Sequence, residues 1–382
     1  MPVSRRGFLR TLGVGTVAGS LAPWSGRAMA TAPKLDGRAT GRDHEGFLLL
    51  DSNENAYGPT PTVVAAAQEA IHQANRYPFR EYDALAEDVA RLHKVQENQV
   101  LLGCGSTDLL RVAASALLGP GRKAITASPT YEDLATYSKG IGADVVTVPL
   151  TPTFAHDLDA MLALIDGATS LVYICNPNNP TASLTPRADI EGFLAKLPPS
   201  VYVVMDEAYH HYVNPSARYV SFLDRPAAND RVIVLRTFSK IHAMAGLRLG
   251  YAVAAPELIQ KMHAHLTDID LNCVAVAAGR AALTDTESVR NFAKRNSDDR
   301  QEFLNQAMAR MLKPIDSHAN FVMMDAHQPA DEVIAHFLKN KIRIGRHFPP
   351  LTHHIRISLG TAAAMEEFWR VWDLQPRSKM AM

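Results

Sequence analysis

The sequence predicts an α/β protein with a mostly parallel, seven-stranded sheet flanked by helices and a second, smaller α/β domain at the C-terminus. Seven short, nearly continuous apolar runs are typical of strands that are buried on both faces. These runs cover residues 99–102, 124–127, 144–148, 170–175, 201–205, 232–235 and 249–254. Helical patterns separate several of them, as at 108–118 and 187–195. This alternation indicates a parallel sheet with helices on both sides, whose ligand lies beyond the carboxyl ends of the strands.

Further elements are predicted before and after these runs. Apolar residues at helical spacing predict one helix over 61–74 and another over 85–92. After Pro256 a long helical region begins, which includes the charged stretch 290–300. A strand, a helix and two more strands follow, at 320–324, 331–339, 342–344 and 355–358. This last group predicts the smaller domain.

Composition limits the classes of function. With 382 residues, 47% of them hydrophobic, the chain can bury the cores of two domains. Its 39 basic and 39 acidic residues cancel, so no nucleic-acid partner is expected. Cys104, Cys175 and Cys273 lie far apart without a CxxC pair, so we expect buried free thiols and no metal site. No segment beyond the first thirty residues is long and apolar enough to predict a transmembrane helix.

The first thirty residues differ from the rest of the chain. Arg5 and Arg6 precede a weakly apolar stretch at 11–22, and small residues follow at 28–30. This pattern resembles a twin-arginine export signal whose middle is too short to anchor the protein in a bilayer. It predicts a periplasmic or otherwise exported protein without membrane contact once the signal is removed. The alternative is a disordered basic tail on a cytoplasmic protein.

Lys240 is the candidate catalytic residue in the stretch 236–251, where it lies between hydroxyl side chains and an arginine. A lysine amine forms a Schiff base with an aldehyde only when part of it is neutral. An apolar pocket with cationic neighbours lowers its pKa toward that state. Ser239 and Arg248 are suited to hold a cofactor phosphate. Together these residues predict covalently held pyridoxal 5'-phosphate.

Two other motifs fit this cofactor. Asp206 ends an apolar strand, and a buried aspartate there would keep the pyridine nitrogen of the cofactor protonated, so that the ring can accept electrons. An aspartate that caps a helix is the alternative. Tyr209 would hydrogen-bond the ring oxygen. The sequence Gly-Cys-Gly-Ser-Thr-Asp-Leu at 103–109 runs from a strand into a helix, whose first backbone amides would bind the phosphate. A dinucleotide site is not expected because the third glycine of that motif is missing.

The Ser-Lys pair at 239–240, followed by Ala-Gly-Leu-Arg-Leu-Gly-Tyr at 245–251, resembles the aspartate-aminotransferase superfamily of fold type I. Its histidinol-phosphate aminotransferase branch is the most similar. Matching motifs run in family order from Asn53 to Gly360. After the export signal predicted at 1–30, the resemblance implies an N-terminal arm with part of the small domain at 31–75, a large cofactor-binding domain at 76–265 and a small domain at 266–382.

The resemblance also assigns residues to the cofactor. Gly105, Ser106 and Thr107 match the phosphate-binding turn of the family, Tyr131 the aromatic residue that stacks on the ring, and Asn179 the amide that contacts the ring oxygen. The family usually has glycine where this chain has Ala182. Tyr77 matches a residue that reaches the cofactor phosphate of a neighbouring subunit, which implies a homodimer with shared sites.

Further matches concern the substrate. Arg356 corresponds to the arginine that holds the substrate α-carboxylate in a two-bond fork. A surface ion pair is the alternative for this residue. Arg346 lies near the position of a substrate-phosphate arginine, although its spacing to Arg356 is shorter than usual. Tyr57 would line the substrate mouth. His242 lies two residues after Lys240, where relatives often carry an aromatic residue, and is a candidate for tuning proton transfer.

The implied reaction moves an amino group between an amino acid or an amino-alcohol phosphate and a 2-oxo acid. The substrate amine displaces Lys240, the freed lysine moves a proton, and a second substrate returns the amine with ping-pong kinetics. Relatives on the same scaffold carry out decarboxylation or oxygen-dependent oxidation and hydroxylation, so these reactions remain alternatives. A non-catalytic binding protein is a further alternative, which the presence of Lys240, Asp206, Tyr209 and Arg356 disfavours.

Overall fold

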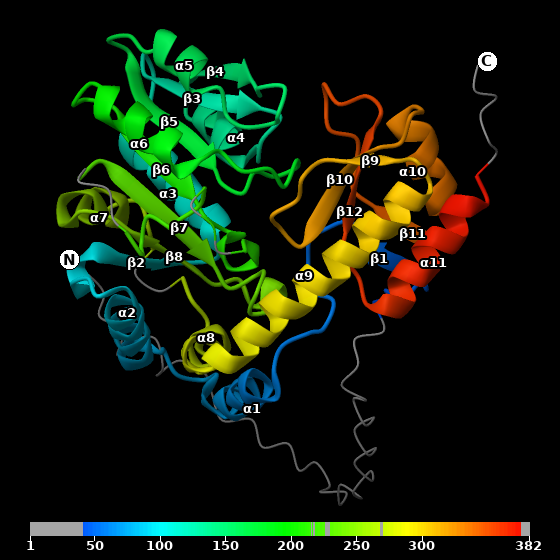
Figure 1. Cartoon of the computed structure of the whole chain (residues 1–382). Helices are drawn as coiled ribbons and strands as arrows, with labels where there is room; N and C mark the ends of the chain where they lie inside the picture. The colour runs from blue at the N-terminus through cyan, green and yellow to red at the C-terminus, as the bar shows by residue number, and fades with distance from the viewer. Residues whose placement is uncertain (1–40, 215, 217, 226–229, 268–269, 376–382) are drawn as a thin grey trace, which may run out of the picture. The chain divides into compact units, whose positions relative to one another are not determined.

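The computed structural model describes residues 41–375 except 215, 217, 226–229 and 268–269. The predicted export signal at 1–30 and the first ten residues of the predicted arm lie outside the described residues. Within the described ranges, the chain forms one seven-stranded sheet and two smaller sheets (Figure 1). None of the helices in these ranges combines the length and the apolar character that a bilayer span requires.

The large sheet has the strand order β2-β8-β7-β6-β5-β3-β4. Its strands are β2 (Val100–Gly103), β3 (Lys123–Ser128), β4 (Asp144–Pro149), β5 (Thr169–Cys175), β6 (Tyr202–Asp206), β7 (Val232–Thr237) and β8 (Gly250–Val253). β8 is antiparallel to both of its neighbours, and the remaining pairs are parallel. The predicted mostly parallel, seven-stranded sheet is therefore confirmed. The expected burial on both faces is wrong for β4, an edge strand in which only Val148 is buried and three of the six residues are exposed.

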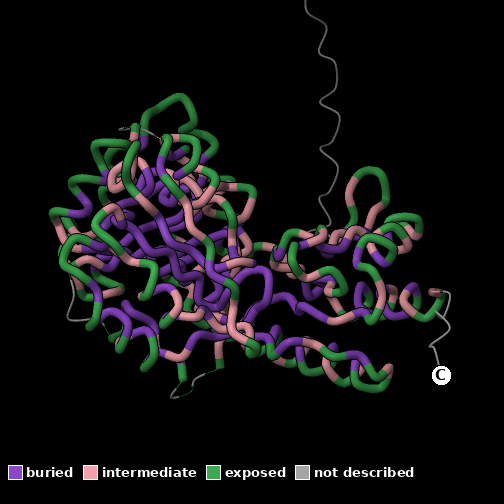
Figure 2. Tube along the Cα trace, turned by 90° about the horizontal axis from the view of Figure 1, so that it is seen from above, coloured by how far each residue is buried: buried purple, intermediate pink, exposed green. Residues whose placement is uncertain are grey.

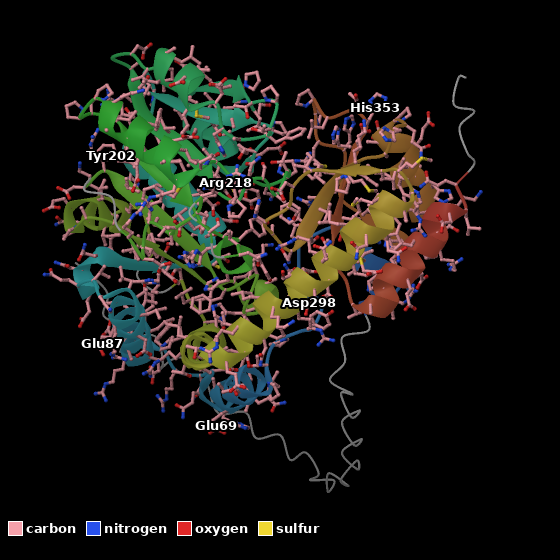
Figure 3. All side chains as sticks on the ribbon, viewed as in Figure 1. Glu69, Glu87, Tyr202, Arg218, Asp298 and His353 are labelled. Atoms are coloured by element: carbon pink, nitrogen blue, oxygen red, sulfur yellow. The ribbon has the colours of Figure 1, made fainter. Side chains whose placement is uncertain are left out.

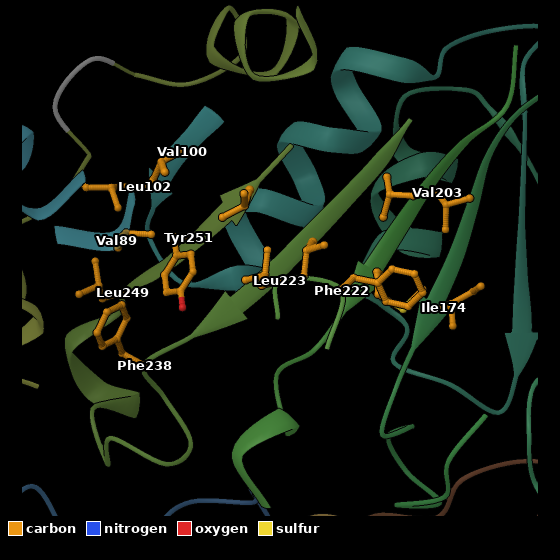
Figure 4. Packing of buried hydrophobic residues seen from close by; sticks show 14 of the residues in the cluster. Val89, Val100, Leu102, Ile174, Val203, Phe222, Leu223, Phe238, Leu249 and Tyr251 are labelled. Atoms are coloured by element: carbon orange, nitrogen blue, oxygen red, sulfur yellow. The ribbon is translucent and has the colours of Figure 1, made fainter. Parts of the chain in front are cut away.

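Helices cover both faces of the large sheet, as predicted. The first face packs against α2 (Phe79–His93), α5 (Leu158–Ala163), α6 (Arg187–Lys196) and α8 (Cys273–Thr284). The opposite face packs against α3 (Ser106–Leu117), α4 (Asp133–Gly140) and α7 (Pro256–His263). Alternate side chains of β5 enter the two cores, with Val172 and Ile174 on the first face and Leu171 and Tyr173 on the other. Figure 4 shows part of the first core, where Ile174 and Val203 lie at one end and Leu249 at the other.

The smaller sheets form a second core with their own helices. β1 (Leu48–Leu50) pairs in parallel with β11 (Ile342–Ile344), and β10 (Phe321–Asp325) lies between β12 (His354–Ser358) and β9 (Lys313–Pro314). The helices around them are α9 (Thr286–Ala309), α10 (Ala330–Lys339) and α11 (Ala362–Asp373). The long helix α9 extends from α8 toward α11, which it contacts (Figure 1). β1, β9, α4, α5 and α11 were absent from the sequence-based prediction.

Several contacts bear on the predicted domain boundaries, which stay predictions. β1 lies in the predicted N-terminal arm but pairs with β11 near the other end of the chain. α8 begins after residue 265 yet contributes to the core of the large sheet and packs against α1 (Pro61–Ala70). The chain therefore crosses between the two cores more than once.

Surface and interior follow the sequence pattern in most places. Buried backbone runs through the middle of both cores, whereas the outer faces of the helices are exposed (Figure 2). Glu69 on α1, Glu87 on α2 and Asp298 on α9 are exposed at the surface (Figure 3). The three cysteines are free, but the expected burial holds only for Cys175; the other two are half-buried.

Candidate active site

A cavity of about 810 Å³ lies beyond the carboxyl ends of β5, β6 and β7, where Cys175, Asp206 and Thr237 are the last strand residues. Its opposite wall consists of residues that follow β1 together with residues of α10, β11, β12 and the segment after β11. Eleven of the residues predicted for the site line this cavity. They are Ser106, Thr107, Tyr131, Asn179, Asp206, Tyr209, Ser239, Lys240, Arg248, Arg346 and Arg356.

Lys240 lies just after β7 and is half-buried. Its Nζ donates a hydrogen bond to the carbonyl oxygen of Ser52 at 3.3 Å and lies 5.7 Å from the centre of the Tyr209 ring. Burial lowers the pKa of Lys240 to about 8, and the positive charge of Arg356 acts in the same direction. A substantial part of this amine is therefore neutral and nucleophilic near neutral pH.

Asp206 is a buried carboxylate on the floor of the cavity. Its Oδ2 accepts a hydrogen bond from the Tyr173 hydroxyl at 2.8 Å, and its Oδ1 accepts one from the backbone N–H of Ala208 at 3.0 Å. Burial raises the pKa of Asp206 to about 6, although these two hydrogen bonds oppose the shift. A cation placed beside this carboxylate would restore its ionised form.

Tyr209 is buried beside Lys240, and its hydroxyl accepts a hydrogen bond from Asn53 Nδ2 at 3.0 Å. Its ring packs edge-on against Phe321, with 5.1 Å between the centroids. Because the phenol oxygen already accepts a hydrogen bond from Asn53, the hydroxyl hydrogen of Tyr209 is available to donate a hydrogen bond to another group. Asn53 is itself held by β12, since its backbone N–H donates to Ser358 Oγ at 2.8 Å.

The predicted phosphate-binding turn surrounds the start of α3. Gly105 precedes the helix with a φ of +80°, a left-handed conformation that glycine adopts without strain. A Cβ atom at Gly105 would overlap the guanidinium of Arg248, so the two groups are in close contact. Arg248 in turn donates from Nη1 to Ser239 Oγ at 3.3 Å. The first backbone N–H groups of α3, the guanidinium of Arg248 and the hydroxyl of Ser239 thus lie close together, which is a favourable set of donors for a phosphate.

Tyr131 lies over the start of α3. Its hydroxyl donates to Asp133 Oδ2 at 2.6 Å and is 3.0 Å from Thr107 Oγ1. Because Tyr131 donates its only hydroxyl proton to Asp133, the Thr107 hydroxyl is the donor of the second hydrogen bond. Burial, together with Asp133, raises the pKa of Tyr131. These contacts hold the aromatic ring at the cavity wall.

Arg356 and Asn179 meet at the opposite wall. Arg356 Nη1 donates to Asn179 Oδ1 at 2.7 Å, and Nη2 donates to the carbonyl oxygen of Asp51. The Nε of Arg356 is buried without a hydrogen-bond partner among the described residues. Burial lowers the pKa of Arg356, so an anion that paired with it would relieve part of this cost.

Four residues considered for the site do not line the cavity. The hydroxyl of Tyr57 donates a hydrogen bond to Oδ2 of Asp299 on α9 at 2.7 Å. Tyr77 is 72% exposed between α1 and α2. Gly105 lies behind the Arg248 guanidinium. His242 packs between the rings of Phe238 and His211, at centroid distances of 5.0 Å and 5.5 Å, and burial lowers its pKa to about 4.

Sequence reasoning missed several residues that complete the site. Asp51, Ser52 and Asn53 supply the hydrogen-bond partners of Arg356, Lys240 and Tyr209. Tyr173 fixes Asp206, and Glu132 lies at the rim. A signal was available for Asn53 alone, because it begins a motif that resembles the family pattern; the others could not be recognised without their spatial neighbours.

These residues fit pyridoxal 5'-phosphate. The turn at Gly105, which a side chain would block, offers backbone, hydroxyl and guanidinium donors to a phosphate group. Asp206 is a buried carboxylate whose raised pKa calls for a cationic neighbour, as a protonated pyridine nitrogen would be. Lys240 is a partly neutral amine within the same cavity. In the described ranges, no group of three or more His, Cys, Asp and Glu side chains could hold a metal ion.

Comparison with known proteins agrees with this geometry. The family model of the class I and II aminotransferases matches residues 45–371. A histidinol-phosphate aminotransferase of Moorella thermoacetica is 36% identical over 325 residues, which are 85% of this chain and 84% of the relative. A solved structure from Erwinia carotovora atroseptica has a TM-score of 0.81 and 33% identity, and covers 86% of this chain and 94% of its own. The histidinol-phosphate aminotransferase of Sinorhizobium meliloti, solved in complex with pyridoxal 5'-phosphate, has a TM-score of 0.79 and 27% identity, with coverages of 85% and 90%. The chain therefore belongs to the class I and II aminotransferases, as a pyridoxal-phosphate-dependent enzyme similar to histidinol-phosphate aminotransferases.

Proposed function

We propose that this enzyme transfers the amino group of an amino acid or of an amino-alcohol phosphate, such as histidinol phosphate, to a 2-oxo acid by a ping-pong mechanism. One observation carries the proposal: Lys240, Asp206, Tyr209, Asn179 and Arg356 come from separate parts of the chain and line one cavity. The relatives that carry the histidinol-phosphate name support the substrate class.

Each residue has a distinct task in this proposal. Pyridoxal phosphate, when bound, supplies an aldehyde carbon for amines and a ring that withdraws electrons from the substrate. Asp206 keeps the ring nitrogen protonated, because a buried carboxylate stabilises an adjacent positive charge. Tyr209 would donate a hydrogen bond from its hydroxyl to the ring oxygen, while that hydroxyl accepts a hydrogen bond from Asn53 Nδ2. The donors around Ser106 and Arg248 hold the phosphate.

Lys240 and Arg356 act on the substrate. With the cofactor bound, the free amine of Lys240 would remove the proton from the substrate Cα, because a pKa of about 8 makes it a competent base near neutral pH. Arg356 binds the α-carboxylate of the amino acid or of the 2-oxo acid. For an amino-alcohol phosphate, which lacks this carboxylate, the phosphate takes the place of the anion near Arg346 and Arg356.

Transamination is tested by measuring three quantities at once: formation of the carbonyl product, consumption of oxygen and release of carbon dioxide. Purified holoenzyme, incubated with histidinol phosphate or free amino acids, should form more than one equivalent of the carbonyl product per active site only when a 2-oxo acid is present, because the first half-reaction of a ping-pong enzyme stops after one turnover. Oxygen consumption or carbon dioxide release without an acceptor would instead identify an oxidase or a decarboxylase. Lys240→Ala should lose the visible absorbance of the holoenzyme and the turnover. A variant that retained both would contradict the assignment of Lys240.

A homodimer is also proposed. Ile71, Tyr77 and Phe79 are 57%, 72% and 56% exposed in the single chain, which is unusual for three large apolar side chains on one short segment. A second copy that covers this segment would bring Tyr77 to the neighbouring phosphate site. Sedimentation velocity should give the mass of two chains, and Tyr77→Ala should weaken cofactor binding. A monomer that retains its cofactor would contradict this proposal.

The export of the protein is the remaining proposal. Its support is the paired Arg5 and Arg6 with the apolar stretch that follows. Cell fractionation should recover the protein outside the cytoplasm, and replacement of both arginines by lysine should retain it inside. Equal recovery of the parent protein and of the lysine variant in the cytoplasm would contradict export and favour the alternative of a disordered basic tail.

A further inference from the structure

The rim of the cavity contains an ion pair between its two walls. Glu132 stands immediately before α4 on the side of the large sheet, and Arg346 follows β11 on the opposite side. Arg346 Nη2 donates to Glu132 Oε2 at 2.6 Å. Both side chains are accessible, at 54% for Arg346 and 63% for Glu132. A ligand that enters the cavity can therefore reach this pair.

Arg346 is held in place by more than Glu132. Its Nη1 donates to the carbonyl oxygen of His347 at 2.8 Å, and its guanidinium lies 4.4 Å from the centre of the Phe348 ring. The guanidinium of Arg356 lies 4.7 Å from the centre of the same ring. Two positive groups are thus gathered around one phenyl ring, and Glu132 neutralises the outer one.

We propose that Glu132 is a specificity-determining residue, whose carboxylate competes with the distal anionic group of a substrate for Arg346. This inference rests on the proposed aminotransferase function. A substrate that ends in a phosphate has to displace the carboxylate and then lies beside its negative charge. A substrate whose side chain carries no anion leaves the pair intact. Glu132 thus shifts the preference of the site away from phosphate esters and toward amino acids with neutral or basic side chains.

The expected size of the effect follows from the exposure of the pair. Ion pairs at the surface are weak, and a like charge near a bound phosphate is partly screened by water. We expect Glu132→Gln to improve binding of a phosphate-bearing substrate by about three- to tenfold. The kcat and the KM for a substrate without a distal anion should stay within about twofold, because Glu132 makes no contact with Lys240 or Asp206.

The experiment compares holoenzyme variants on two donors, histidinol phosphate and histidinol. Glu132→Gln should lower the KM for the phosphate donor alone, whereas Arg346→Gln should raise it. The double variant should show no gain over Arg346→Gln, because the target of the competition is absent. Glu45→Gln is the matched control: Glu45 is an exposed carboxylate that pairs with a different cavity arginine, Arg343, at 3.6 Å. It should change neither KM.

A binding measurement separates this inference from the proposed function. Isothermal titration of the holoenzyme with inorganic phosphate should give a lower dissociation constant for Glu132→Gln than for the parent, even if neither donor is turned over. Absence of turnover with both donors together with this tightening would refute histidinol phosphate as the amino donor but support the role of Glu132. An unchanged dissociation constant, or equal KM changes for both donors, would overturn the role of Glu132.

Discussion

The reactivity of Lys240 provides the sharpest test of the site. Burial and the charge of Arg356 lower its pKa from 10.5 to about 8. At pH 7 about one amine in ten is then neutral, compared with about one in three thousand at the ordinary pKa. The reactive fraction is therefore raised about 300-fold. Uptake of pyridoxal phosphate by the apoprotein should depend on this fraction, because only the neutral amine attacks an aldehyde.

The assay is a stopped-flow measurement of the absorbance change when the apoprotein is mixed with pyridoxal phosphate at pH 6 to 10. The rate should rise with pH and level off above about pH 8. Arg356→Gln should move this midpoint upward by about half a unit to one unit, since a positive neighbour of the amine is lost. Arg343→Gln is the control, because Arg343 lines the same cavity but lies 3.5 Å from Asp43.

Two results would refute this reasoning. A rate that still rises in proportion to hydroxide up to pH 10 would mean that the amine has an ordinary pKa and that burial does not neutralise it. Equal midpoints for Arg356→Gln and Arg343→Gln would mean that the charge of Arg356 has no effect on Lys240. Either result would remove the basis for assigning base catalysis to this lysine near neutral pH.

Three further predictions concern positions around the site. Arg236 and Glu207 form a buried ion pair at 3.0 Å, so Arg236→Met should lower the free energy of unfolding in urea by about 3–5 kcal/mol. Lys294→Met, at an exposed pair, should change it by less than about 1 kcal/mol. Similar losses in both variants would contradict the role of burial. Ala182 is buried and has a φ of +60°, a left-handed conformation that strains alanine. Ala182→Gly should therefore raise the free energy of unfolding by about 0.5–1 kcal/mol. A decrease would show that the alanine is unstrained. Asn53→Asp keeps a residue type that tolerates the φ of +53° at this position, but it replaces the hydrogen-bond donor to Tyr209 with an acceptor. The pH at which the visible band of the holoenzyme titrates should therefore rise by about one unit. An unchanged titration would exclude a role of Asn53 in positioning Tyr209.

The large sheet could be predicted because its strands are short, apolar and separated by helical patterns. β5 is the clearest case, since all seven of its residues are buried and none is charged. Shorter elements carry too little pattern: β1 has three residues and β9 has two, and the partner of β1 is β11, near the other end of the chain. The edge position of β4 could not be predicted either, because it depends on the order of the strands in the sheet.

Parts of the site were predictable for a related reason. Asp206 ends the buried strand β6 and Lys240 follows the buried strand β7, so parallel topology brings them to one edge of the sheet. The partners of these groups were not predictable, because they join distant parts of the chain. Asn53 and Tyr209 are 156 residues apart in sequence, and Glu132 and Arg346 are 214 apart.

The geometry of the site depends on the pairing of β1 with β11. The three residues after β1 provide the hydrogen-bond partners of Arg356, Lys240 and Tyr209, and two of these partners are backbone carbonyl groups. Their positions are therefore fixed by where the strand ends and not by side-chain identity. A slip of one residue in the β1–β11 register would move these carbonyl oxygens by about 3.3 Å and turn Leu48 and Leu50 out of the smaller core. Burial of these two leucines thus stabilises the register that places the hydrogen-bond acceptors of Lys240 and Arg356.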